Sequence, residues 1–139
     1  MKLSIVIPVY NSSKIIDELI DRILNSINSL NLSNNFELIL VNDFSLDNSW
    51  QKILYFAKKY PFLKGFNLDD NYGQHNAIMA GLNNAQGEFI ITMDDDLQHS
   101  PEFFSTILNK LKTYDVCYTN YRKRKHSFWK KIVSIINNI

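Results

Sequence analysis

Three consecutive carboxylates, Asp94, Asp95 and Asp96, follow a short apolar run at residues 89–93. The run is rich in residues that favour strands, so it predicts a buried strand that ends at the acids. Three adjacent carboxylates repel one another and cannot be buried together without partners. A divalent cation turns that repulsion into attraction. Because side chains alternate along an extended chain, Asp94 and Asp96 are expected to face the cation and Asp95 to point away. Out of context, the same three acids would suit a solvated turn equally well.

Other polar clusters also follow segments with the pattern of strands. Strands are predicted at residues 3–9, 36–41, 63–68, 89–93 and 115–120, with helices at 15–30, 50–57, 74–84 and 101–111. Alternation of this kind predicts an α/β fold with a mostly parallel sheet and helices on both faces, in three α/β/α layers. Ligands of such sheets collect at the carboxyl ends of the strands. The polar clusters at residues 10–11, 42–43, 69–73 and 94–98 should therefore lie along one edge of the sheet.

The helix predicted at 74–84 follows directly after the polar cluster at 69–73. Ile78, Met79 and Leu82 are expected to pack against the sheet. Gly81 lies inside this helix, where a glycine permits a neighbouring element to approach closely. Gly73, directly before the helix, is expected to take a backbone conformation that other residues avoid.

The composition is that of one globular domain. The chain has 139 residues, 45% hydrophobic content and a formal net charge of +1, so no overall field favours nucleic acid. The single Cys117 excludes an internal disulfide and fits a reducing compartment. The chain begins with a strand pattern instead of a signal peptide, and its apolar runs are short for a membrane span. We therefore expect a cytoplasmic protein.

Basic charge is concentrated near the carboxyl terminus. Residues 122–131 carry six of the fifteen Lys and Arg and no acid, whereas the rest carries nine basic against fourteen acidic side chains. An amphipathic helix with Phe128 and Trp129 is predicted to follow. This pairing suits peripheral contact with the cytoplasmic face of an anionic membrane. A helix that closes the core or fills a dimer contact fits equally well, and an unprotected sheet edge would also allow a homo-oligomer. We divide the chain into a core at 1–121 and a basic, amphipathic segment at 122–139.

Four segments occur in an order and at separations typical of a known family. They are Ile-Pro-Val-Tyr-Asn at 7–11, Val-Asn-Asp-Phe-Ser-Leu-Asp at 41–47, Asn-Tyr-Gly-Gln at 71–74 and Asp-Asp-Asp-Leu-Gln-His-Ser-Pro-Glu at 94–102. Together they resemble the inverting family-2 glycosyltransferases with the Rossmann-like GT-A fold. Within that family they resemble the polyprenyl-phosphate glycosyltransferases, the branch that includes dolichyl-phosphate mannose synthase. The Asp-x-Asp-Leu-Gln-x-x-Pro-Glu pattern is the specific part, and the resemblance runs from Leu3 to about Arg124.

The resemblance implies roles for residues that match the family's motifs. The metal, Mg²⁺ or Mn²⁺, is expected at Asp94, Asp96 and Gln98. Catalysis is expected to depend on Asp94, Asp96 and Arg122, the last as a contact of the diphosphate. The nucleotide of a UDP- or GDP-sugar is expected to contact Pro8, Tyr10, Asn11, Asp43, Asn71, Gly73, Asp94 and Asp95. Asp43 is the implied partner of the base.

Three positions depart from the family's pattern. An acidic residue commonly follows the Asn of the first motif, and here it is Ser12. Asn42 and Phe44 stand where Asp and Gly are more usual. Asn42 can still form hydrogen bonds, whereas Ser12 removes one expected contact with the nucleotide.

The implied reaction is transfer of a sugar to a polyprenyl phosphate or a saccharide, in glycolipid or polysaccharide synthesis. A hydroxyl acceptor needs a general base, whereas a phosphate is already an anion. No acid after Glu102 suits a base, because Asp115 is predicted to start a strand, so a phosphate acceptor is favoured. Family members normally continue further, so the acceptor side is expected to be truncated, and a nucleotide-sugar-binding remnant without turnover is the alternative. A receiver-like signalling domain fits less well, because Asn120 and Tyr121 occupy the place of its late lysine.

Overall fold

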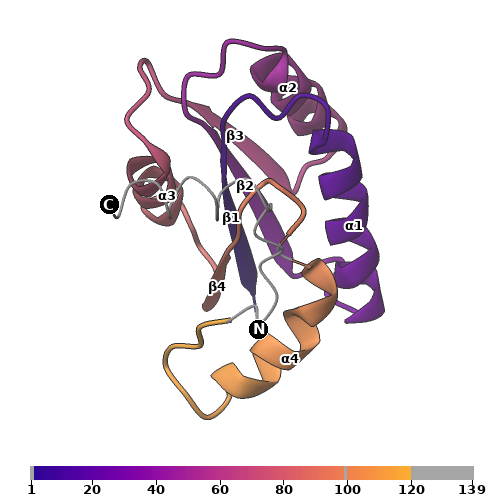
Figure 1. The fold of residues 1–139 in the computed structure, drawn as a ribbon. Helices are drawn as coiled ribbons and strands as arrows, with labels where there is room; N and C mark the ends of the chain where they lie inside the picture. The colour runs from indigo at the N-terminus through magenta and orange to yellow at the C-terminus, as the bar shows by residue number, and fades with distance from the viewer. Residues whose placement is uncertain (1, 99, 120–139) are drawn as a thin grey trace, which may run out of the picture.

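The computed structural model describes residues 2–98 and 100–119 and shows a parallel sheet between layers of helices (Figure 1). The elements along the chain are β1 (Leu3–Val9), α1 (Ile16–Ser29), β2 (Phe36–Asn42), α2 (Ser49–Lys59), β3 (Leu63–Asn67), α3 (Gln74–Leu82), β4 (Phe89–Thr92), a 3₁₀ turn η1 (Pro101–Phe103) and α4 (Phe104–Leu111). The α/β fold class predicted from the sequence is confirmed.

The four strands are parallel and lie in the order β3-β2-β1-β4. The pairing of β1 with β2 runs from Leu3 opposite Phe36 to Val9 opposite Asn42. The pairing of β1 with β4 is shorter and ends where Val6 lies opposite Thr92. Both central strands, β1 and β2, are buried along their whole length, which explains their nearly continuous apolar sequences.

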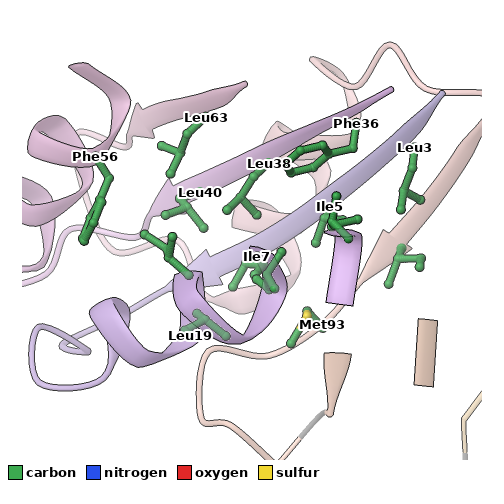
Figure 2. Packing of buried hydrophobic residues seen from close by; sticks show 14 of the residues in the cluster. Leu3, Ile5, Ile7, Leu19, Phe36, Leu38, Leu40, Phe56, Leu63 and Met93 are labelled. Carbon is green, nitrogen blue, oxygen red and sulfur yellow. The ribbon is translucent and has the colours of Figure 1, made fainter. Parts of the chain in front are cut away.

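One face of the sheet carries the larger core, under α1, α2 and α4 (Figure 1). Ile5 and Ile7 of β1 and Leu38 and Leu40 of β2 point to this face and pack with Leu19 of α1 (Figure 2). These side chains are spaced two apart in the strands, so alternation along an extended chain places them together. The amphipathic spacing of α1 supplies the facing layer.

The opposite face is covered by α3 and has a smaller core, formed by Val6, Ile39, Val41 and Ala77. A Cβ atom at Gly81 would lie 2.3 Å from Cγ1 of Val6, so the close approach expected at this glycine is confirmed. The packing predicted for Met79 is wrong, because its side chain is 53% exposed. The helix lies so near the sheet that small residues face it in place of long ones.

A closed hydrogen-bond network joins the strands on the α3 face near their amino ends. The buried carboxylate of Glu37 accepts hydrogen bonds from Ser4 Oγ at 2.6 Å, Lys64 Nζ at 2.7 Å and the backbone N–H of Gln86 at 2.6 Å. Burial raises the pKa of Glu37, but these hydrogen bonds outweigh burial and lower the pKa to about 2. We call these four residues the amino-end network.

The fifth strand predicted at 115–120 is wrong for residues 115–119, which form neither strand nor helix. Val116 and Tyr118 have the alternation of a strand but are 63% and 93% exposed. Alternating β-prone residues form a strand only where a neighbouring strand offers hydrogen bonds. The segment 120–139, with the predicted basic helix and Arg122, lies outside the described residues. Among the helices that are described, none is long and apolar enough to cross a membrane.

Candidate nucleotide-sugar site

A pocket of about 380 Å³ lies at the carboxyl ends of the strands. Its walls come from the end of β1, from the segments that follow each of the four strands, and from the first residue of α3. The lining residues are Pro8, Val9, Tyr10, Asp43, Asn71, Gly73, Gln74, Asp94, Asp95 and Asp96. Polar clusters far apart in the sequence therefore meet at one edge, as parallel strand order requires.

Asp43 connects the segment after β2 to the segment after β3. Its side chain is buried, and its two carboxylate oxygens accept hydrogen bonds from the backbone N–H groups of Tyr72 and Gly73, both at 2.9 Å. Gly73 has φ of 86°, so the prediction that this residue takes a conformation suited to glycine is confirmed. Asp43 thus both lines the pocket and fixes Gly73 at its wall.

The segments after β1 and β2 are fastened to each other by side chains. Asn11 donates its N–H to Ser45 Oγ at 2.9 Å and accepts the Leu46 N–H at 2.8 Å through Oδ1. Asp47 accepts the N–H of Ser13 at 3.0 Å and that of Ser49 at 2.9 Å. Burial raises the pKa of Asp47, but hydrogen bonds from Ser49 and Ser13 lower it to about 2. Asn11 therefore joins two loops and does not itself line the pocket.

The three acids after β4 bond in three different directions. Asp94 Oδ1 accepts from Gln74 Nε2 of α3 at 2.5 Å, and Asp96 Oδ1 accepts the N–H of Gln98 at 3.0 Å. Asp95 Oδ2 instead accepts hydrogen bonds from the N–H of Tyr10, at 3.2 Å, and from the hydroxyl of Ser12. Burial raises the pKa of Asp95, and the bonds from Ser12 and Tyr10 oppose that rise in part. Because β4 ends at Thr92, strand alternation does not govern these side chains.

Arg22 of α1 forms hydrogen bonds with the segment that follows the three acids. The Arg22 guanidinium donates to the Leu97 carbonyl at 3.5 Å, to Ser100 Oγ at 3.3 Å and to Glu102 at 3.0 Å. The hydrogen bond from Arg22 and a second from Ser100 hold the pKa of Glu102 at about 2. Leu97 has φ of 60°, an uncommon value for a residue other than glycine, so the anchor acts where the backbone turns sharply.

The donor set at the pocket fits a divalent cation such as Mg²⁺ or Mn²⁺. Asp94 and Asp96 offer hard carboxylate oxygens, and these ions favour few protein carboxylates together with water and phosphate oxygens. The described partners of Asp43 and Asp95 are neutral N–H and O–H groups, which bring no positive charge to these carboxylates. Within residues 2–98 and 100–119, no group of three or more His, Cys, Asp or Glu is arranged to hold a metal alone.

The sequence identified most of the residues that line the pocket, but not all of the residues that hold the lining in place. Of the residues expected at the nucleotide or metal, Asn11 and Gln98 lie outside the pocket lining, and Arg122 lies outside the described residues. Gln74 lines the pocket and was not assigned a role, although it ends the Asn-Tyr-Gly-Gln motif. Arg22 was missed because its helical spacing is that of an ordinary surface residue. Phe44, found where glycine is usual, has φ of 57°, which explains that preference.

The family model for glycosyl transferase family 2 matches residues 4–137, and the chain belongs to this family. A curated relative, the undecaprenyl-phosphate 4-deoxy-4-formamido-L-arabinose transferase of Proteus mirabilis, is 41% identical over 140 residues, covering 99% of this chain and 42% of the relative. The transferase of the same name from Photorhabdus laumondii is 40% identical with the same coverage. The chain thus spans about two fifths of the length of these relatives.

Solved structures share the fold. S. aureus TarS (residues 1–349) in complex with UDP-GlcNAc has 27% identity and a TM-score of 0.65, covering 94% of this chain and 38% of that one. The mannosyltransferase PcManGT from Pyrobaculum calidifontis, in complex with GDP-Man and Mn²⁺, has a TM-score of 0.73 over 93% of this chain and 37% of that one. Its 20% identity supports the fold alone.

Proposed function

We propose that the pocket binds the nucleoside diphosphate part of a UDP- or GDP-sugar together with Mg²⁺ or Mn²⁺. The convergence of four acidic side chains on one pocket, Asp43 after β2 and Asp94, Asp95 and Asp96 after β4, carries this proposal. Asp94 and Asp96 would hold the metal, with Gln98 nearby. A bound divalent cation neutralises charge on the departing diphosphate.

The protein's own residues provide the remainder of the donor site. Pro8 and Tyr10 form a wall at the end of β1, and the Tyr10 ring is about half exposed toward solvent. Asp43 and Gly73 form another part of the lining, where Asp43 is the proposed partner of the base. Arg122, by resemblance to the family, would contact the diphosphate.

For the acceptor we favour a polyprenyl phosphate over a saccharide. A phosphate carries its negative charge near neutral pH and attacks without a general base, whereas a saccharide hydroxyl must lose a proton. The similarity to two transferases whose names contain undecaprenyl-phosphate supports this choice. The competing function is binding of a nucleotide sugar without transfer.

Calorimetry tests the donor site. The full chain is titrated with UDP and GDP, with and without Mn²⁺ or Mg²⁺, and we expect metal-dependent binding of at least one nucleotide. The absence of binding to both nucleotides with metal present would refute the donor site and the transferase proposal together.

Transfer is tested separately from binding. The chain is incubated with radiolabelled nucleotide sugars, Mn²⁺ and either a polyprenyl phosphate or an oligosaccharide, and lipid-linked and free sugar are separated. Label in the lipid fraction supports the phosphate acceptor, and label on the oligosaccharide supports the saccharide. Nucleotide binding without either product supports the binding function.

A second proposal concerns residues 122–139, on the evidence of sequence alone. We place them in peripheral contact with an anionic membrane at the cytoplasmic face, with lysines at the headgroups and Phe128 and Trp129 at the interface. Flotation with liposomes that contain anionic lipid should recover the full chain but not a chain that ends at Tyr121. Equal flotation of both would remove this proposal.

A further inference from the structure

Asp95 lies between the two proposed metal ligands in sequence but is bonded to the segment after β1. Its Oδ2 accepts the Tyr10 N–H at 3.2 Å and the Ser12 hydroxyl. The same hydroxyl lies 3.2 Å from the Tyr10 carbonyl, and the Ser12 N–H donates to Ser49 Oγ at 2.8 Å. Asp95 therefore holds a three-residue segment, Tyr10 to Ser12, whose first residue forms part of the pocket wall.

The sheet does not provide this connection at the same point. Pairing between β1 and β4 ends at Val6 and Thr92, with one more backbone bond from the Met93 N–H to the Val6 carbonyl at 3.2 Å. Beyond that point the segment that follows β1 and the segment that follows β4 separate around the pocket. Asp95 joins them again on the far side of the divergence.

The Tyr10–Ser12 segment is fixed separately on its other side. Ser45 and Ser49, which follow β2, bond the N–H groups of Asn11 and Ser12. Loss of Asp95 would therefore leave residues 10–12 attached to the segment after β2. It would break their connection to the segment that carries Asp94 and Asp96. The change would alter the spacing between two walls of the pocket without unfolding either.

We propose that Asp95 is a positioning residue, which sets Tyr10 at the correct distance from Asp94 and Asp96 so that nucleoside and diphosphate bind together. This inference rests on the proposed function of the pocket. It differs from direct contact between Asp95 and the nucleotide or metal, because the carboxylate acts through its bonds to Tyr10 and Ser12.

The two roles predict different results for ligands of different length. Pyrophosphate with Mn²⁺ needs only the half of the pocket that contains Asp94 and Asp96. UDP or GDP with Mn²⁺ needs that half and the Tyr10 wall at once. A positioning role therefore weakens nucleotide binding and leaves pyrophosphate binding unchanged.

The variants are Asp95→Ala, Asp95→Asn and Ser12→Ala, with Asp115→Ala as a control at an exposed acid outside the pocket. Calorimetry measures the affinity of each full chain for UDP, GDP and pyrophosphate with Mn²⁺. For Asp95→Ala we expect nucleotide affinity about 10-fold weaker, the size expected for loss of hydrogen bonds to a charged group, and pyrophosphate affinity within about 2-fold.

The neutral isostere separates geometry from charge. Asp95→Asn retains an oxygen that accepts both hydrogen bonds, so its nucleotide affinity should stay within about 3-fold of the unsubstituted chain. As a single variant, Ser12→Ala should weaken nucleotide binding. In the double variant with Asp95→Ala it should cause little further loss, because both substitutions break the same contact. Amide hydrogen exchange should show faster exchange at residues 10–12 in Asp95→Ala and not in Asp95→Asn.

Each contrary result identifies a different error. If Asp95→Asn binds nucleotide as weakly as Asp95→Ala, the charge matters and Asp95 contacts the ligand or metal directly. Weakened pyrophosphate binding in Asp95→Ala would place it in the metal half, and unchanged affinities in every variant would remove any positioning role. If Asp95→Ala does not fold, Asp95→Asn and Ser12→Ala still decide between these outcomes. Failure of the unsubstituted chain to bind either nucleotide would instead refute the proposed function, and this role with it.

Discussion

Acidic side chains occur at both ends of the parallel sheet, but their surroundings differ. Toward the amino ends, Glu37 is buried and receives a cationic donor, Lys64, with Ser4 and Gln86. At the carboxyl ends, the acids line a pocket of about 380 Å³, and the described partners of Asp43 and Asp95 are neutral groups. A charge compensated inside the fold contributes to stability, whereas an uncompensated charge beside a pocket attracts an external cation.

Asp96→Ala should show the largest difference between an effect on ligand binding and an effect on stability. Asp96 is exposed at the pocket, and removing its carboxylate should weaken Mn²⁺-dependent binding of UDP or GDP by at least about 100-fold, because loss of a mere hydrogen-bond partner of a metal ligand already costs about 10- to 100-fold. Its free energy of unfolding should change by less than about 0.5 kcal/mol. Calorimetry and urea denaturation measure the two quantities. Unchanged metal-dependent affinity would show that Asp96 does not hold the metal.

Glu37→Gln should show the opposite pattern. The substitution leaves Lys64 without its anionic partner, and we expect a loss of about 2 kcal/mol in the free energy of unfolding, reduced from the fully buried case because Lys64 is partly exposed. Nucleotide affinity should stay within about 2-fold, since Glu37 lies outside the pocket lining. A large loss of affinity at full stability would contradict the division between the two ends.

Acid should weaken the amino-end network in a defined range of pH. The pKa of Glu37 is lowered in the folded chain to about 2 from an ordinary value of 4.5. The carboxylate therefore contributes stability above pH 4.5, and this contribution is lost as the pH falls from 4.5 toward 2. Urea denaturation at several pH values should show the gap between the unsubstituted chain and Glu37→Gln narrowing as the pH is lowered. A constant gap would mean that the pKa of Glu37 is the same in the folded and the unfolded chain.

Arg22→Gln should have the smallest effect on nucleotide binding. It tests whether α1 supports the acids at the carboxyl ends of the strands. Loss of the bonds to Leu97, Ser100 and Glu102 should weaken nucleotide binding about 3-fold and cost about 1 kcal/mol of unfolding free energy. Lys52→Gln is the matched control, since Lys52 pairs with Asp17 on the surface away from the pocket. An equal effect of both variants on affinity would remove the anchoring role of Arg22.

The fold and the edge that bears the pocket were predictable because they depend on repeating local patterns. Short runs of strand-favouring residues identify β1 to β4, helical spacing identifies α1, and parallel order then brings the strand ends together. Asp43 and Asp94 could be found in this way. The predicted strand at 115–120 shows the limit of such local patterns. Alternating residues do not form a strand unless a neighbouring strand is there to pair with.

The supports of the pocket could not be predicted, because they depend on contacts between loops. The expectation that Asp95 points away from Asp94 and Asp96 assumed strand geometry beyond Thr92, but β4 ends at Thr92 and all three acids line the pocket. The bonds from Asp95 to Tyr10 and Ser12 span more than eighty residues of sequence. No local pattern in the sequence identifies such partners.

The unequal lengths of the two ladders beside β1 have a consequence for how this pocket can change. Pairing with β2 continues to Val9, whereas pairing with β4 stops at Val6, a difference of three residues that corresponds to roughly 10 Å of extended chain. The part of β1 that extends beyond its pairing with β4 includes Pro8 and Val9, which line the pocket. Insertion of a residue between Met93 and Asp94 would change how far the acids extend past the strand while Met93 keeps its place in the larger core.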